Sequence, residues 1–244
     1  MQMIQPVQQQ NYYVVNGRLQ AMVAQQEMID YTVSPSNIVP FHGRHYLSTL
    51  AHSPMNIDDF NYPSVEHYYQ ACKLYTLAGG DSAWRMSSVT DSAQCKITAR
   101  SVLNLAKIPP KTVDAWRRTD APEILVFGNA YKFAQNRELR DRLLDTGDAL
   151  LVHTFEKDDL YAVGMNEEST KKWALDKKGK HIQVPRYFLK DWFVQSNKLP
   201  TYNVRGKNIL GVILMMIREA FRPERGRADP KIVEVLEMAR GRLF

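Results

Sequence analysis

Residues 62–73 read YPSVEHYYQACK, and they hold the most informative pattern in the chain. Ser64 is a good N-cap, and the residues after it predict a helix over residues 65–77 that is ended by a Gly-Gly pair. On such a helix one stripe carries a carboxylate, an amide and an amine, namely Glu66, Gln70 and Lys73. These groups are either suited to flanking a small ligand or form the polar outer edge of an amphipathic helix.

The segments on either side predict further helices and a few short strands. Apolar spacing and turn residues indicate helices over residues 92–105, 123–136, 138–145 and 208–221, and strands over residues 37–41, over residues 149–155 and near Tyr161. Asp229 and Pro230 are suited to begin one more helix near the C-terminal end. Because no strand–helix–strand rhythm is visible, we expect an α+β fold, a mainly helical single domain with a small β-sheet.

Composition divides the chain into three parts. Residues 1–36 are rich in glutamine, residues 37–222 are denser in aromatic and aliphatic side chains, and residues 223–244 restart a helix. We therefore predict one core domain over residues 37–222, with an N-terminal extension and a C-terminal helical extension that packs on the domain or on a partner.

The overall composition limits the class of protein. With 244 residues, 44% of them hydrophobic, the chain can bury a large core, and its cysteines, Cys72 and Cys95, are too few for a disulfide framework. The longest apolar stretch, residues 209–217, is far shorter than the ~20 residues that cross a bilayer. The first residues lack the pattern of a secretory signal. We expect a cytoplasmic (intracellular) protein that does not bind a membrane.

Positive charge exceeds negative charge in this chain. The net charge is +6, the pI is about 9.2, and basic residues crowd the C-terminal half. Such a balance favours polyanionic partners, including phosphate-bearing ligands and nucleic acid. Runs of charge are also common on ordinary solvated surfaces, so this signal is weak.

The segment at residues 64–73 belongs to a series of motifs spread in order over the core. The other members are IVPFHG (38–43), YLSTL (46–50), KFAQN (132–136), the LL, TGD and LV groups within residues 143–152, and NILGVILMMIR (208–218). In sequence and order this series resembles the NADAR (YbiA-like) family. The resemblance covers roughly residues 38–222 and implies the YbiA-like/NADAR fold.

This resemblance implies an N-glycosidase, a hydrolase that cleaves the C1–N bond between ribose or ADP-ribose and a base. Some members act on ribosylated pyrimidine intermediates of riboflavin synthesis, and others remove ADP-ribose from guanine bases of nucleic acid. Cleavage builds oxocarbenium character at C1, so the site needs a negative charge or a nucleophile beside C1 and a proton donor for the leaving nitrogen. The expected substrate is an ADP-ribosyl or ribosyl N-glycoside, including ADP-ribosylated DNA or RNA, and no cofactor is needed.

The catalytic candidates are Glu66, Lys73 and Asp158. Glu66 can supply negative charge or polarise water, and Asp158 can orient the ribose hydroxyls or activate water. Lys73 can attack C1 and form a transient imine if burial lowers its pKa, which is the role that the resemblance implies for the family's lysine. The candidates for substrate binding are Ser48, His67, Gln70, Tyr161, Asn208 and Arg218. The alternative is that these residues have only a structural role. The sequence contains no motif with metal-ligand spacing.

The segment after the strand predicted at residues 149–155 departs from the family pattern. A glutamate of the family is replaced by His153, a tryptophan by Tyr161 and a glycine by Ala162, whereas Asp158 and Gly164 remain. Retention of all the catalytic candidates favours catalysis. These replacements do not determine which substrate is used. They also allow a second hypothesis, in which the chain is a module that binds ADP-ribose or NAD without turnover. The terminal extensions allow a third hypothesis, in which the chain is an interaction protein.

Overall fold

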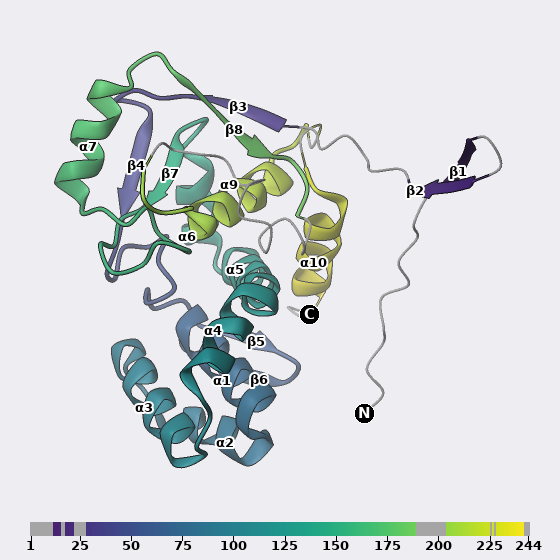
Figure 1. Ribbon diagram of the computed structural model, residues 1–244, viewed down its shortest axis with the longest axis vertical. Coiled ribbons are helices and arrows are strands. Elements are labelled where there is room, and N and C mark those ends of the chain that lie inside the picture. The colour runs from purple at the N-terminus through teal and green to yellow at the C-terminus, as the bar shows by residue number, and fades with distance from the viewer. Residues whose placement is uncertain are drawn as a thin grey trace.

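The computed structural model describes residues 12–15, 18–21, 28–188, 204–224, 226 and 228–241. Part of the extension predicted over residues 1–36 lies outside these ranges; its described part includes the antiparallel pair of β1 (Tyr12–Val15) and β2 (Arg18–Ala21). Helices dominate the described residues, and the strands among them occur in two-stranded pairs (Figure 1). This confirms the mainly helical α+β class.

Of the strand pairs within residues 28–188, two join distant parts of the chain and one is a local hairpin. The antiparallel pairs are β3 (Met28–Thr32) with β8 (His181–Pro185) and β5 (Met55–Ile57) with β6 (Phe60–Tyr62). The parallel pair is β4 (Ile38–Phe41) with β7 (Leu150–His153). In the parallel pair Phe41 lies opposite His153, so the end of β7 is held beside the end of β4.

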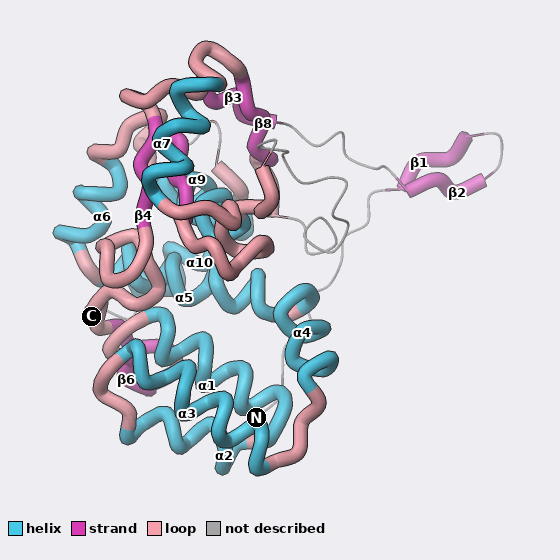
Figure 2. The backbone as a smooth tube through the Cα atoms, turned by 60° about the vertical axis from the view of Figure 1, so that its left-hand side comes forward, coloured by secondary structure: helices cyan, strands magenta, loops and turns pink. Residues whose placement is uncertain are grey.

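The helices lie on two sides of α5 (Ala121–Gln135). Figure 2 shows α1, α2 and α3 on one side of α5 and α6, α7 and α9 on the other. The chain from residue 65 to residue 119 forms α1 (Val65–Ala78), α2 (Gly80–Trp84), the 3-10 helix η1 (Arg85–Ser88), α3 (Ser92–Leu105) and α4 (Pro110–Thr119). The helices that follow α5 in the chain are α6 (Arg137–Leu144), α7 (Glu167–Asp176), α9 (Ile209–Phe221) and α10 (Pro230–Gly241).

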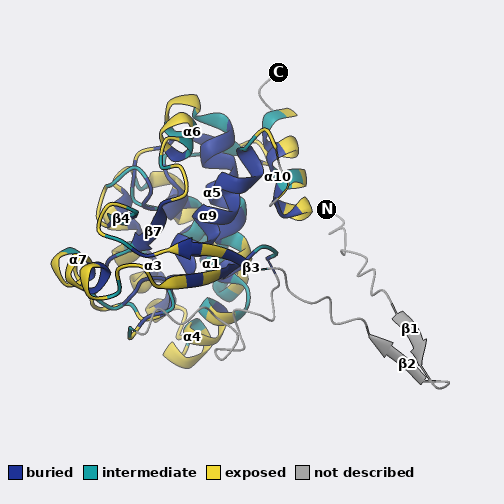
Figure 3. Ribbon diagram, turned by 90° about the horizontal axis from the view of Figure 1, so that it is seen from above, coloured by how far each residue is buried: buried dark blue, intermediate teal, exposed yellow. Residues whose placement is uncertain are grey.

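The helix α9 lies at the centre of the core because nearly all of its side chains are apolar. Every residue from Ile209 to Phe221 is buried, and the helix packs against α5, β7 and α10; Figure 3 shows α5 and α9 as largely buried. Gly211 permits the close contact with β7, since a Cβ at this position would lie 2.2 Å from the Leu151 carbonyl oxygen. This packing fixes the position of β7.

All six predicted helices are confirmed within a few residues, namely α1, α3, α5, α6, α9 and α10. The strand predicted near Tyr161 is wrong: the chain there forms a loop that folds back on β7, with the Val163 N–H donating to the His153 carbonyl at 3.0 Å. The helices α2, α4 and α7 were not predicted. The reason is visible in α4, where Trp116 is the one buried residue, so few apolar side chains mark the helix.

Candidate active site

A cavity of about 520 Å³ lies where α1, α3 and α4 face β7 and the loop after it. It gathers all the catalytic candidates and two of the binding candidates, namely Glu66, Lys73, Asp158, Gln70 and Tyr161. Other polar lining residues are Thr49, Tyr69, Lys96, Arg100, Asn104, Asp114, Arg117 and His153. The cavity therefore combines carboxylates, amines, amides and an imidazole.

Glu66 lies in the first turn of α1 and is only 3% exposed. Both of its carboxylate oxygens accept hydrogen bonds: Thr49 Oγ1 donates to Oε2 at 2.8 Å, and Gln70 Nε2 donates to Oε1 at 2.7 Å. The interpretation of this residue as the polar outer edge of a helix is wrong. Because both donors are neutral, they fix the orientation of the carboxylate without cancelling its charge.

Lys73 follows Glu66 by two turns of α1 and lines the same cavity. Its Nζ lies 5.9 Å from the centre of the Tyr69 ring, and in the described part of the chain it meets no hydrogen-bond acceptor. Burial lowers the pKa of Lys73 to about 8; the charge of Glu66 opposes this shift, and the charge of Lys96 adds to it. A sizeable fraction of this side chain is therefore the nucleophilic free amine near neutral pH.

Gln70 has one hydrogen-bonding atom that the fold leaves unused. The side chain is 2% exposed, and Nε2 donates to Glu66. The Oε1 atom is buried without a partner among the described residues. Leaving such an oxygen unpaired costs about 1–3 kcal/mol, so a ligand or water that donates to it gains binding energy.

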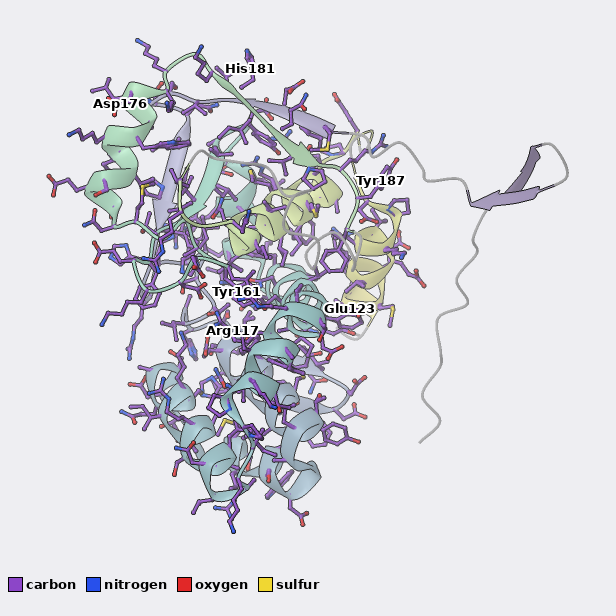
Figure 4. The ribbon with its side chains drawn as sticks, in the orientation of Figure 1. Arg117, Glu123, Tyr161, Asp176, His181 and Tyr187 are labelled. Atoms are coloured by element: carbon purple, nitrogen blue, oxygen red, sulfur yellow. The ribbon has the colours of Figure 1, made fainter. Side chains whose placement is uncertain are left out.

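Arg117 of α4 closes one side of the cavity. Its Nη2 lies 3.2 Å from Asp158 Oδ2, and its guanidinium carbon lies 5.4 Å from the centre of the Tyr161 ring; Figure 4 shows Arg117 and Tyr161 next to each other. Asp158 Oδ1 accepts the backbone N–H groups of Leu160 and Tyr161, each at 2.9 Å. The Tyr161 hydroxyl donates to the Arg117 carbonyl. Asp158 is thus engaged by Arg117 and its own loop.

His153 lies at the end of β7 and lines the cavity. Its ring is stacked on Phe41, with 5.1 Å between ring centres and 14° between ring planes. Its Nδ1 lies 3.3 Å from the Tyr161 carbonyl oxygen. Burial lowers the pKa of His153 to about 4, so the imidazole is neutral near pH 7.

Ser48 and His67, two of the predicted binding residues, lie outside this cavity. Ser48 Oγ accepts the backbone N–H of Leu50 at 3.2 Å. The His67 ring lies between Ser64 Oγ at 2.7 Å and the Val89 carbonyl at 3.1 Å, beside a smaller cavity of about 240 Å³. The fold uses both side chains to hold the start of α1 and the loop before it.

Asn208 and Arg218 also lie outside the cavity, and they hold α9 against its neighbours. Asn208 Nδ2 donates to the Leu151 carbonyl and Oδ1 accepts the His153 N–H, both at 2.8 Å. Its φ of 55° is left-handed, a conformation that asparagine tolerates. Arg218 is fully buried and donates to two groups of the segment 146–149. These contacts give both residues a structural role.

The sequence failed to identify several residues that line the cavity: Thr49, Tyr69, Lys96, Arg100 and Arg117. Thr49 lies inside the YLSTL motif, so the motif itself was a usable signal. Lys96 and Arg100 are four residues apart and therefore share one face of α3. Arg117 lies on a helix that no sequence pattern predicted, and nothing local marks it.

The described residues also lack two kinds of feature. No helix among them is long and apolar enough to cross a membrane. In the same ranges, no group of three or more His, Cys, Asp or Glu side chains is placed to hold a metal ion.

Comparison with known proteins places the chain in a family. The NADAR domain family matches residues 34–222, a range that contains every residue lining the cavity. An N-glycosidase of Acanthamoeba polyphaga mimivirus is 30% identical over 168 residues, which cover 68% of this chain and 78% of that protein. The NMR structure of the E. coli protein YbiA is 20% identical, with 80% of this chain and 90% of that chain covered at a TM-score of 0.49. By the extent of the family match, the chain belongs to the NADAR family.

Proposed function

We propose that this chain is a hydrolase of N-glycosyl bonds that removes ADP-ribose from guanine bases of nucleic acid. The observation that carries the proposal is the presence in one cavity of a buried, oriented carboxylate, Glu66, and an amine of lowered pKa, Lys73. The related mimivirus protein is named an N-glycosidase, which supports the reaction type.

Lys73 is the nucleophile in this scheme. Its free amine attacks C1 of the ribose while the C1–N bond to the base breaks, and the departing nitrogen keeps the bonding electron pair. One amine proton reaches that nitrogen through Glu66, and the other protonates the ring oxygen as the ribose opens, which leaves an imine between C1 and Nζ. Water then hydrolyses the imine, releasing ADP-ribose and the free amine. The Glu66 carboxylate also stabilises positive charge at C1.

The charge of the cavity favours a substrate that carries phosphate. Lys96 and Arg100 lie one turn apart on α3, line the cavity and form no ion pair with the described residues. Two such cations suit the diphosphate of ADP-ribose. The cavity volume of about 520 Å³ is within the range of small-molecule sites, roughly 300–1,000 Å³. The net charge of +6 favours a substrate attached to DNA or RNA.

Two other functions fit the same cavity. An N-glycosidase of ribosylated riboflavin-pathway intermediates would use the same Glu66 and Lys73. A module that binds ADP-ribose or NAD without turnover is favoured by one observation, the engagement of Asp158 by Arg117 and two backbone N–H groups. Asp158 is then not free to activate water, and Glu66 has to act without a second free carboxylate.

The test is mass-spectrometric turnover of an ADP-ribosylated guanine oligonucleotide, NAD and a ribosylamino-pyrimidine. Wild type is compared with Glu66→Gln, and Asp114→Asn is the matched control. Asp114 also lines the cavity, but its carboxylate pairs with Arg118 at 3.0 Å and is about half exposed. The expected result is release of ADP-ribose from the oligonucleotide by wild type and the control, with none by Glu66→Gln.

Other outcomes select between the alternatives. Release from the pyrimidine alone would change the substrate, and binding of ADP-ribose without turnover of any of the three compounds would replace the enzyme by the binding module. Borohydride added during turnover should reduce the imine and leave a sugar adduct on Lys73. An active enzyme that forms no adduct would instead attack C1 directly with water.

A further inference from the structure

The structure fixes which nitrogen of the His153 ring carries a proton. Nδ1 lies 3.3 Å from the Tyr161 carbonyl oxygen, and a carbonyl can only accept a hydrogen bond. Nδ1 therefore carries the proton, and Nε2 of the neutral ring has a free lone pair. Nε2 has no hydrogen-bond partner in the part of the chain that the structure describes, and the residue lines the cavity.

Several contacts hold this ring in place. It is stacked on Phe41 at 5.1 Å, and the backbone N–H of His153 donates to Asn208 Oδ1 at 2.8 Å. Val163 N–H donates to the His153 carbonyl at 3.0 Å. The lowered pKa of about 4 keeps the ring neutral. His153 is therefore a preorganised acceptor that loses little freedom when a ligand binds.

Two other histidines have the opposite arrangement. His45 Nδ1 accepts the backbone N–H of Leu47 at 3.3 Å, so Nε2 of His45 carries the proton. His67 Nε2 lies 3.1 Å from the Val89 carbonyl, so it also carries the proton. Of these three rings, His153 is the one whose Nε2 is an acceptor.

Several charged groups that line the cavity are unsuited to accept a hydrogen bond from a ligand. Lys96 and Arg100 can only donate hydrogen bonds when they are charged. The carboxylates of Glu66 and Asp158 are already engaged by other residues. His153 Nε2 and the unpartnered Gln70 Oε1 described above are two acceptors at the cavity that a neutral donor can use.

We propose that His153 Nε2 accepts a hydrogen bond from a ribose hydroxyl of the substrate and so positions the sugar. The inference rests on the proposed function, which supplies the ribose. His153 acts here as a positioning residue that contacts substrate, and it does not serve as the general base. A ribose hydroxyl is a neutral donor, which matches a neutral acceptor held in one orientation.

The tautomer is tested directly by NMR on the full chain labelled with ¹⁵N-histidine, near neutral pH. We expect a proton on Nδ1 of His153 and on Nε2 of His45 and His67, which serve as internal references. Saturating ADP-ribose should shift the Nε2 resonance of His153 and leave His67 unchanged. A protonated Nε2 in His153, or an Nε2 resonance that ADP-ribose does not move, would overturn the proposal.

Kinetics test the hydroxyl contact with His153→Phe, which keeps a ring for Phe41 to stack on, and with His153→Gln, which restores an acceptor. We expect KM to rise about tenfold in His153→Phe, with kcat changed less than about threefold and partial rescue in His153→Gln. Wild type should lose about tenfold in kcat/KM on either the 2′-deoxy or the 3′-deoxy substrate, whereas His153→Phe should show no such loss. A loss that persists in the variant for both analogues, or a kcat reduced about 100-fold as for a missing base, would contradict the contact.

These outcomes separate the two proposals. If wild type cleaves the oligonucleotide while ADP-ribose leaves the His153 resonance unmoved, the inference on His153 fails and the proposed function stands. If no substrate is cleaved while the resonance moves, the proposed function fails and His153 remains a ribose-binding residue. The spectra need no variant, so the inference remains testable if His153→Phe does not fold.

Discussion

Turnover should depend steeply on pH, because Lys73 must lose its proton before it can attack C1. Burial lowers the pKa of this lysine to about 8. The free amine then makes up about 1% of the side chain at pH 6, about 9% at pH 7 and about 50% at pH 8, against about 0.03% at pH 7 for an ordinary lysine. We expect kcat/KM to rise about 50-fold from pH 6 to pH 8 and to level off above about pH 9.

The assay is the initial rate at substrate concentrations below KM, with the yield of borohydride-trapped adduct on Lys73 measured at each pH. His153 stays neutral over this range because its pKa is about 4. Lys132 titrates in the same range, since burial lowers its pKa to about 7, but it lies outside the cavity and donates to the Ser48 carbonyl at 2.9 Å. The Lys132→Met variant is therefore the control, and its midpoint should equal that of wild type.

A second variant tests how much a neighbouring positive charge contributes to the lowered pKa of Lys73. Lys96→Gln removes a positive charge that helps to lower the pKa of Lys73. The midpoint of the kcat/KM profile should therefore move to higher pH, and the height of the plateau should also fall because Lys96 no longer contacts the diphosphate of the substrate. A flat profile from pH 6 to pH 8, or a midpoint that shifts in Lys132→Met and not in Lys96→Gln, would refute Lys73 as the nucleophile.

Further predictions concern stability as well as activity. Glu66→Ala should lose turnover and about 1–3 kcal/mol of unfolding free energy because it leaves the buried Gln70 amide and the partly buried Thr49 hydroxyl without their acceptor. In thermal melts Glu66→Gln should stay closer to wild type, and an unchanged Tm for the alanine variant would contradict the observed burial. Gly211→Ala should cost about 2 kcal/mol or more in denaturant titrations, since its Cβ would clash with the Leu151 carbonyl oxygen; Gly80→Ala, where the nearest atom is 3.8 Å away, is the control and should be close to neutral. The free energy of unfolding of wild type should rise between about pH 7 and pH 10, because the lowered pKa of Lys132 means that the unfolded chain binds more protons there than the folded chain. Urea unfolding at both pH values should show a smaller rise in Lys132→Met. An equal rise in the variant would contradict the lowered pKa of Lys132.

Sequence patterns predicted the fold where apolar spacing is strong. The helix α9 is almost entirely apolar, and α1 has a capping serine and a closing glycine, so both were predicted close to their observed ends. The helices α4 and α7 bury few residues, and the pairing of β4 with β7 depends on packing against α9. Such features depend on contacts between distant segments and leave little local signal.

The candidate site, like the fold, has parts that the sequence predicted and parts that it did not. The stripe of Glu66, Gln70 and Lys73 follows from helical spacing, and the structure places all three at the cavity. For Arg218 the sequence left substrate contact and a structural role open, and in the fold its guanidinium donates to Thr146 and Ala149. The roles of Arg117 and His153 depend on partners more than forty residues away or across a strand pair, as in the contact of Arg117 with Asp158.

The parallel pairing of β4 with β7 also has a consequence for the order of folding. Residues 42–149 lie between the two strands, so their pairing closes a long loop and carries a high entropic cost. Contacts of such large sequence separation form late in folding. The turns of α1 that carry Glu66 and Lys73 are local structure, but His153 and the Asp158 loop reach them only after this closure and after α9 has docked on β7. During synthesis, the chain should therefore gain activity only once the ribosome has released α9, and shorter nascent chains should be inactive.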